Sequence, residues 1–416
     1  MGQASYRPAV SGGRGRIFLL IGRAFVLLGL GVLVGGLFFP DAVSLVENNL
    51  GSVRLNRALL AEGLAAEAAT AQGATEAVRA GERFQRALAW NPLNGKAYQN
   101  LATIYGAWAD EASAAQAASR AAALMPGDAV ARFTYGEALA ARGDEAEAIR
   151  EWRAAGAAEA LVRRGQRLAG QGAAPGAREA AVRAYRRAVA VDPELAEAHL
   201  RLGQALSRLG RKGEALEAFA AAAEADRGTS SRPYLLQAEV HVAREEWTAA
   251  LGAYREAAAR APLDPEPHYR RGWVLGERLG DRGAAAAAFE RALRIDPEHG
   301  PSRRALGELE AERGHCDAAA EVVEPLLGAE GAAGLHLALG RCLVGEGRDG
   351  EALVHLERAA ALDGDSVAVL LDLGRTYARA GRFEEAVEAY RQALMVAPGN
   401  EEAERALEEL GALGTR

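Results

Sequence analysis

The stretch GHCDAA, residues 314–319, brings a histidine, a cysteine and an aspartate together, and these residue types can bind metals or act in nucleophilic catalysis. A metal site would need further ligands at a suitable spacing, and no second Cys/His pair of that kind occurs. Asp317 also suits the first turn of a helix, where a carboxylate is favourable. We therefore predict no metal ion at this stretch.

Other catalytic patterns are missing from the sequence. It contains no phosphate-binding loop, no dinucleotide-binding fingerprint and no nucleophile elbow. Glutamate runs such as EEAERALEEL, residues 401–410, have the spacing of solvated helix faces. We predict a protein that is not an enzyme, with no catalytic residues and no cofactor.

Composition and charge restrict the fold and the partners. Alanine, leucine, glutamate and arginine dominate, which favours an all-α fold. The formal net charge is −7, although residues 1–40 contain four arginines and no acidic residue, so the remainder carries −11. An acidic body repels phosphate backbones, and we expect no nucleic-acid partner.

An apolar run near the N-terminus predicts a membrane anchor. Residues 17–39 contain one charge, Arg23, and as a helix they would span about 34 Å, enough for the hydrocarbon core. The alternative is a cleaved signal peptide, but the run is long for one and ends in FFPD without small residues at a cleavage position. Because arginines precede the run and acids follow it, residues 1–16 should be a cytoplasmic tail and the body should lie outside the cytoplasm. Gly31 and Gly35 form a GxxxG pair that could support a weak homodimer.

Behind this anchor, one pattern recurs at intervals near 34 residues. YRRAVAVDPELAEAHLRLG (185–203) resembles FERALRIDPEHGPSRRALG (289–307) and FQRALAWNPLNGKAYQNLA (84–102). Apolar residues at i, i+3, i+4 and i+7 predict one helix, a polar turn follows, and a second apolar stripe ends near a proline. Each unit is thus a helical hairpin that buries its apolar face only by stacking on its neighbours.

The pattern resembles the tetratricopeptide repeat family over residues 61–399. We count ten repeats, starting near residues 61, 95, 129, 162, 196, 231, 265, 300, 333 and 367. The resemblance implies a right-handed superhelical solenoid. Residues 40–60 would form a linker and leading helix, and residues 400–416 a capping helix and tail. Two repeats fit poorly: the first, with Glu67 at an apolar position, and the fourth, where a loosened turn and a long loop both remain open and we favour the loop.

The resemblance also implies a concave surface lined by the first helix of each hairpin. The residues at its inward-facing positions are the predicted protein-binding groove: Phe133, Leu200, Leu235, Tyr269, Trp273, Arg304, Leu337, Arg341, Leu371 and Arg375. The Lys and Asn pair that clamps a C-terminal carboxylate in some members of the family is absent. The alternative is that these residues merely pack neighbouring first helices together.

Histidines and cysteines take structural positions within the same repeat frame. His199, His268, His336 and His241 fall at packing positions and should be interior residues. Cys316 begins a second helix and Cys342 lies toward the end of the next first helix, so the two adjacent helices could bring them within disulfide range. Both the bridge and two free, buried thiols remain open, and the sequence favours free thiols.

Together these features predict a non-catalytic, membrane-anchored scaffold at the extracytoplasmic face of a bacterial-type inner membrane. The alternative is an accessory subunit of an envelope enzyme complex, for glycan synthesis or cytochrome maturation, whose catalytic residues belong to another chain. A soluble cytoplasmic adaptor would require that residues 17–39 not be an anchor.

Overall fold

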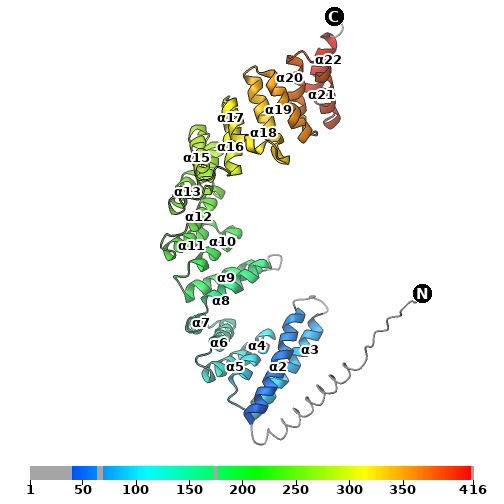
Figure 1. The fold of residues 1–416 in the computed structure, drawn as a ribbon. Coiled ribbons are helices and arrows are strands. Elements are labelled where there is room, and N and C mark those ends of the chain that lie inside the picture. The colour runs from blue at the N-terminus through cyan, green and yellow to red at the C-terminus, as the bar shows by residue number, and fades with distance from the viewer. Residues whose placement is uncertain (1–39, 63–68, 172–175, 414–416) are drawn as a thin grey trace, which may run out of the picture. The chain divides into compact units, whose positions relative to one another are not determined.

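A computed structural model of the chain describes residues 40–62, 69–171 and 176–413, and every regular element in these ranges is helical (Figure 1). The predicted anchor at 17–39, with Gly31 and Gly35, lies outside the described residues. Among the helices of the described ranges, none has the length and apolar character needed to cross a membrane.

The chain divides into two compact units, Met1–Ala198 and His199–Arg416. Helices of the first unit run antiparallel in consecutive pairs: α2 (Pro40–Glu62), α3 (Ala69–Trp90), α4 (Gly95–Ala107), α5 (Glu111–Leu124), α6 (Ala129–Ala141), α7 (Glu145–Ala154), α8 (Ala158–Gly170) and α9 (Ala177–Val191). Helices α4 to α9 form three hairpins, the predicted second to fourth repeats.

The predicted first repeat has a different structure. Instead of a short hairpin starting at residue 61, two long helices, α2 and α3, pack along each other. Phe84 on α3 is fully buried and contacts Gly51 on α2, and Arg83 pairs with Glu47 at 2.9 Å. The stretch of α3 in which a turn was predicted contains Gly73 but no proline, and a single glycine costs a helix only about 1 kcal/mol. The helix therefore continues through it.

The fourth repeat consists of two regular helices, α8 and α9, joined by residues 171–176, of which 172–175 lie outside the described residues. Its first helix begins at Ala158 rather than near residue 162.

The second unit continues the same hairpin pattern. Its elements are α10 (Ala196–Arg208), which begins just before the unit boundary, α11 (Lys212–Ala225), α12 (Arg232–Ala243), α13 (Trp247–Arg260), α14 (Glu266–Trp273), the π-helical turn η1 (Val274–Arg278), α15 (Arg282–Ile295), α16 (Gly300–Glu312), α17 (Cys316–Val323), the 3₁₀ turns η2 (Glu324–Leu326) and η3 (Glu330–Ala332), α18 (Ala333–Gly345), α19 (Asp349–Leu362), α20 (Val367–Arg379), α21 (Phe383–Val396) and α22 (Glu401–Leu413). First helices of successive repeats, α14, α16, α18 and α20, pack side by side.

In most hairpins, a first-helix glycine receives a bulky side chain of the second helix. A Cβ atom added at Gly203 would lie 2.5 Å from Cε1 of Phe219, and one added at Gly374 would lie 2.9 Å from Cε1 of Tyr390. The absent side chain lets the two helix backbones approach closely, and the aromatic ring fills the space between them.

Helix ends follow local rules. Asn94, Asp110, Asp128 and Asp281 accept backbone N–H groups at the starts of α4, α5, α6 and α15. At the end of the unit, α22 places fully buried Ala403 against the core formed by α20 and α21. This helix covers the last apolar face of the repeat array.

Candidate functional site

Helices α14, α15, α16 and α18 of the second unit, together with η1, line two adjoining hollows. The first, of about 720 Å³, lies between α14 with η1 and α16, and its lining includes the predicted groove residues Tyr269, Trp273 and Arg304. The second, of about 630 Å³, lies between α16 and α18 and includes Leu337 and Arg341. Glu308 and Glu312 line both hollows. We call the two hollows together the groove; each has the volume typical of a ligand pocket.

A one-residue insertion shapes the first hollow. In the eighth, ninth and tenth repeats, the first-helix glycine and its bulky partner are 16 positions apart, as in Gly374 and Tyr390. In the seventh repeat the pair is Gly272 and Phe289, 17 positions apart. The π-helical turn η1 lies between them and accommodates the extra residue. Such turns often occur at functional sites, and here Gly276 and Glu277 of η1 line the hollow.

Aromatic side chains are fixed by their neighbours around this turn. The guanidinium of Arg278 contacts the faces of two indoles, with its Cζ 4.9 Å from the ring centroid of Trp273 and 5.6 Å from that of Trp247. Tyr269 packs against Phe289, with ring centroids 6.0 Å apart, and edge-on against His299 at 5.6 Å. Tyr269 and Trp273 therefore line the hollow and also pack within the repeat, and their predicted binding role stays a prediction.

The carboxylates of the groove are unevenly paired. Arg282 pairs with Glu312 at 3.3 Å, whereas among the described residues no hydrogen bond or ion pair engages Glu277 or Glu308. Burial raises the pKa of the Glu308 carboxyl above its ordinary value; Arg304 opposes the shift, and the carboxylates of Glu312 and Glu277 add to it. The site thus contains a partly buried carboxyl group, that of Glu308, whose negative charge is only partly balanced by nearby cations.

Two predicted arginines are already engaged within the protein. Arg341 forms an ion pair with Asp372 at 2.5 Å. Arg375 contacts the same carboxylate at 3.5 Å and Glu402 at 2.5 Å. These contacts link α18, α20 and α22 along one face, so both arginines contribute to the stacking of the repeats.

The remaining predicted groove residues are mainly packing residues. Leu200 and Leu371 are 7% and 9% exposed, and Leu371 belongs to the core between α20 and α21. Leu235 packs against the core of its own hairpin. Phe133, in the first unit, is partly buried, and its carbonyl accepts a hydrogen bond from the indole of Trp152.

Sequence reasoning overlooked the acidic residues of the groove. Glu308 is at the same repeat position as Trp273, Arg341 and Arg375, so aligning the repeats would have identified it as a groove residue. Glu312 follows one helical turn later. Glu277 is at the same repeat position as Glu312, four residues after Trp273, so the repeat register contained a signal for it as well.

The histidines pack largely as predicted for interior positions. His199 and His336 are buried, and His268 and His241 are partly buried, with His241 bonded to Glu246 at 2.7 Å. Within the described ranges, no group of three or more His, Cys, Asp or Glu side chains could hold a metal ion.

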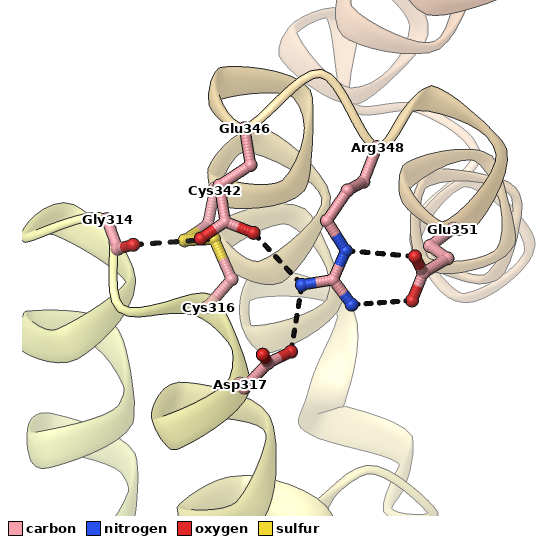
Figure 2. A network of polar contacts seen from close by, with 7 residues as sticks. All are labelled: Gly314, Cys316, Asp317, Cys342, Glu346, Arg348 and Glu351. Atoms are coloured by element: carbon pink, nitrogen blue, oxygen red, sulfur yellow. Dashed lines mark hydrogen bonds and ion pairs between the residues drawn. A yellow bond between two sulfur atoms is a disulfide. The ribbon is translucent and has the colours of Figure 1, made fainter.

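Cys316 on α17 and Cys342 on α18 form a disulfide, with their Cα atoms 5.6 Å apart. The structure thus differs from the free-thiol state that the sequence favours. Figure 2 shows Arg348 beside this bridge, hydrogen-bonded to Asp317 on α17, to Glu346 after α18 and to both oxygens of Glu351 on α19. These hydrogen bonds, to Glu351 first, raise the pKa of Arg348. Cys342 also lines the second hollow, so the bridge supports the wall of the groove.

Comparison with known families agrees with the hairpin architecture. Family models described as tetratricopeptide repeat match residues 196–229, 235–300, 304–367 and 343–410, and one described as TPR repeat matches residues 175–210. Together these matches cover more than half of the chain. No curated protein matches it.

Among solved structures, similar ones include a tetratricopeptide repeat protein from Parabacteroides merdae, at 18% identity and a TM-score of 0.39, covering 61% of this chain and 99% of the other. MamA from Desulfovibrio magneticus, from residue 41 to its end, is 23% identical with a TM-score of 0.38, covering 41% and 97%. PilW, a type IV pilus biogenesis factor, is 21% identical with a TM-score of 0.40, covering 51% and 98%. These likenesses concern the fold alone.

Proposed function

Because the chain belongs to the tetratricopeptide repeat family, whose members bind other proteins or peptides, we propose that it is a non-catalytic scaffold that binds a partner protein in its groove. The observation that carries this proposal is the pair of adjoining hollows between α14, α16 and α18. An exposed concavity lined by tyrosine, tryptophan and arginine contains the residue types in which binding hot spots are enriched.

The proposal includes an anchor and a compartment. The apolar run 17–39, with arginines before it and acids after it, supports a single membrane-spanning helix with the repeats outside the cytoplasm. The disulfide between Cys316 and Cys342 is consistent with that compartment, because disulfides persist in oxidising surroundings and are rare in the cytosol.

Photo-crosslinking in intact cells tests the binding role. A photoreactive amino acid at Glu312, which is exposed and lines both hollows, should form an adduct with a partner protein. The same amino acid at Glu321, exposed on α17 and lining neither hollow, is the matched control. Equal adducts from both positions, or adducts from the control alone, would contradict groove binding. A partner with an active site would favour the accessory-subunit alternative.

Protease treatment of spheroplasts tests the topology. The repeat body should be digested while a short N-terminal fragment survives in the membrane fraction. A body that is fully protected, or found entirely in the soluble fraction, would contradict the proposed orientation or anchor.

A further inference from the structure

Glu308 and Glu312 stand one helical turn apart on α16, along the boundary between the two hollows. A ligand that extends from one hollow into the other must pass over these side chains. The side chains at this boundary therefore determine which chemical groups a ligand can place across the groove.

Most other charged groups of the groove are already neutralised within the protein. Arg341 is paired with Asp372, Arg313 with Glu310 at 2.7 Å, and Arg282 with Glu312. Arg304 donates to the carbonyl of Gly331 at 3.4 Å. The carboxylates of Glu277 and Glu308 have no such partner among the described residues, so two unpaired acidic groups line the first hollow, and Arg304 is the cation that acts on Glu308.

Apolar surface flanks this carboxylate pair on both sides. Tyr269, Phe289 and Leu309 line the first hollow, and Leu337 and Ala338 line the second. The first helices of neighbouring repeats are separated by about 8–10 Å, which equals about three residues of an extended chain. A peptide lying across the groove would therefore present side chains to the two hollows about three residues apart.

We propose that the groove binds an extended peptide segment of a partner in which a lysine or arginine reaches Glu308 and Glu277 while an apolar side chain about three residues away fills the second hollow. This inference rests on the proposed binding function and specifies the chemistry of the bound segment. The cation would complete the pairing of a partly buried carboxylate, which a neutral or acidic segment would leave unpaired.

The probe for the test is a phage-displayed library of random dodecapeptides, selected on the full-length chain in detergent micelles. Selected sequences should be enriched in lysine or arginine followed or preceded by a large apolar residue at the spacing above. Synthetic versions of the strongest binders, and analogues with the basic residue replaced by glutamine, then provide affinities for the wild type, Glu308→Gln and Glu277→Gln.

Glu308→Gln should weaken binding of the basic peptides about tenfold, the loss typical of one charge-assisted hydrogen bond. The glutamine analogues should bind the wild type and the variant equally, because the interaction has already been removed. Glu321→Gln is the matched control and should bind like the wild type. The Glu308→Gln variant removes a partly buried charge, and its thermal unfolding checks that it is folded.

Two results would overturn the inference, and they differ in what they imply for the proposed function. If selected peptides lack basic residues, or are acidic, but still respond to Tyr269→Leu, the groove binds peptides of another chemistry and the proposed function stands. If no selected peptide responds to any groove substitution, the groove is not a peptide site and the proposed function fails with it.

Discussion

The Nδ1 atoms of His336 on α18 and His355 on α19 lie 3.1 Å apart, between two buried or partly buried rings. Nε2 of His336 also lies 3.3 Å from the carbonyl oxygen of Leu327, which can only accept. In the neutral pair, His336 therefore carries its proton on Nε2, and Nδ1–H of His355 donates to the bare Nδ1 of His336.

This pair predicts acid sensitivity of the second unit. Burial lowers the pKa of both rings below the ordinary value of 6.5. At His336, the positive charge of Arg358 lowers the pKa further. At His355, His336 lowers the pKa further and the carboxylate of Glu351 opposes the shift. The unfolded chain then binds more protons, so the free energy of unfolding should fall as pH drops below about 6.5. Urea unfolding at neutral and mildly acidic pH should show a smaller fall in the His336→Gln/His355→Gln variant. An equal fall in both proteins would contradict this assignment.

The close contact between Gly203 and Phe219 predicts that an added methyl group destabilises the fold. In Gly203→Ala the new Cβ would clash with the ring of Phe219, and such overpacking destabilises a fold by about 1–3 kcal/mol. This cost exceeds the stabilisation that the higher helix propensity of alanine provides. Gly252 on α13 has open space around its Cα, so Gly252→Ala should instead stabilise by up to about 1 kcal/mol. Thermal unfolding of the two variants should show shifts of opposite sign, and shifts of the same sign would contradict the packing argument.

The disulfide between Cys316 and Cys342 should contribute measurably to stability. The bridged residues are 26 positions apart, and restricting the unfolded chain over such a loop is worth about 3 kcal/mol. Reductant should lower the melting temperature of the wild type and leave that of Cys316→Ala/Cys342→Ala unchanged. Two alkylatable thiols in denatured, unreduced protein would show that the bridge does not form in the cell.

Trp273 should matter for folding as well as for binding. Trp273→Ala removes its stacking on Arg278 and its packing against the core formed by α12, α13 and η1, a loss of about 2–4 kcal/mol. The control is Trp90→Ala, because Trp90 is 47% exposed at the end of α3 and should tolerate truncation with little loss. Similar unfolding midpoints for both variants would contradict the packing role of Trp273.

The local pattern of the sequence determined the repeat register. First helices begin at Gly95, Ala129, Ala196, Gly300, Ala333 and Val367, the positions that the 34-residue period predicts. This works because helical periodicity, capping residues and a glycine opposite a bulky side chain are set within a single hairpin. The binding role of the groove residues stays a prediction.

Contacts between residues far apart in sequence decided the rest. Helix α2 packs along α3 with Phe84 buried against Gly51, a residue that precedes the first predicted repeat. The inserted residue of the seventh repeat forms the π-helical turn η1, whose Gly276 and Glu277 line the first hollow. The distance between Cys316 and Cys342 depends on how α17 packs against α18, and this packing brings them close enough to form a disulfide. The charges around Glu308 likewise depend on how neighbouring helices stack. A period along the chain specifies which face of each helix is buried, whereas the partner that each side chain meets depends on how neighbouring hairpins pack.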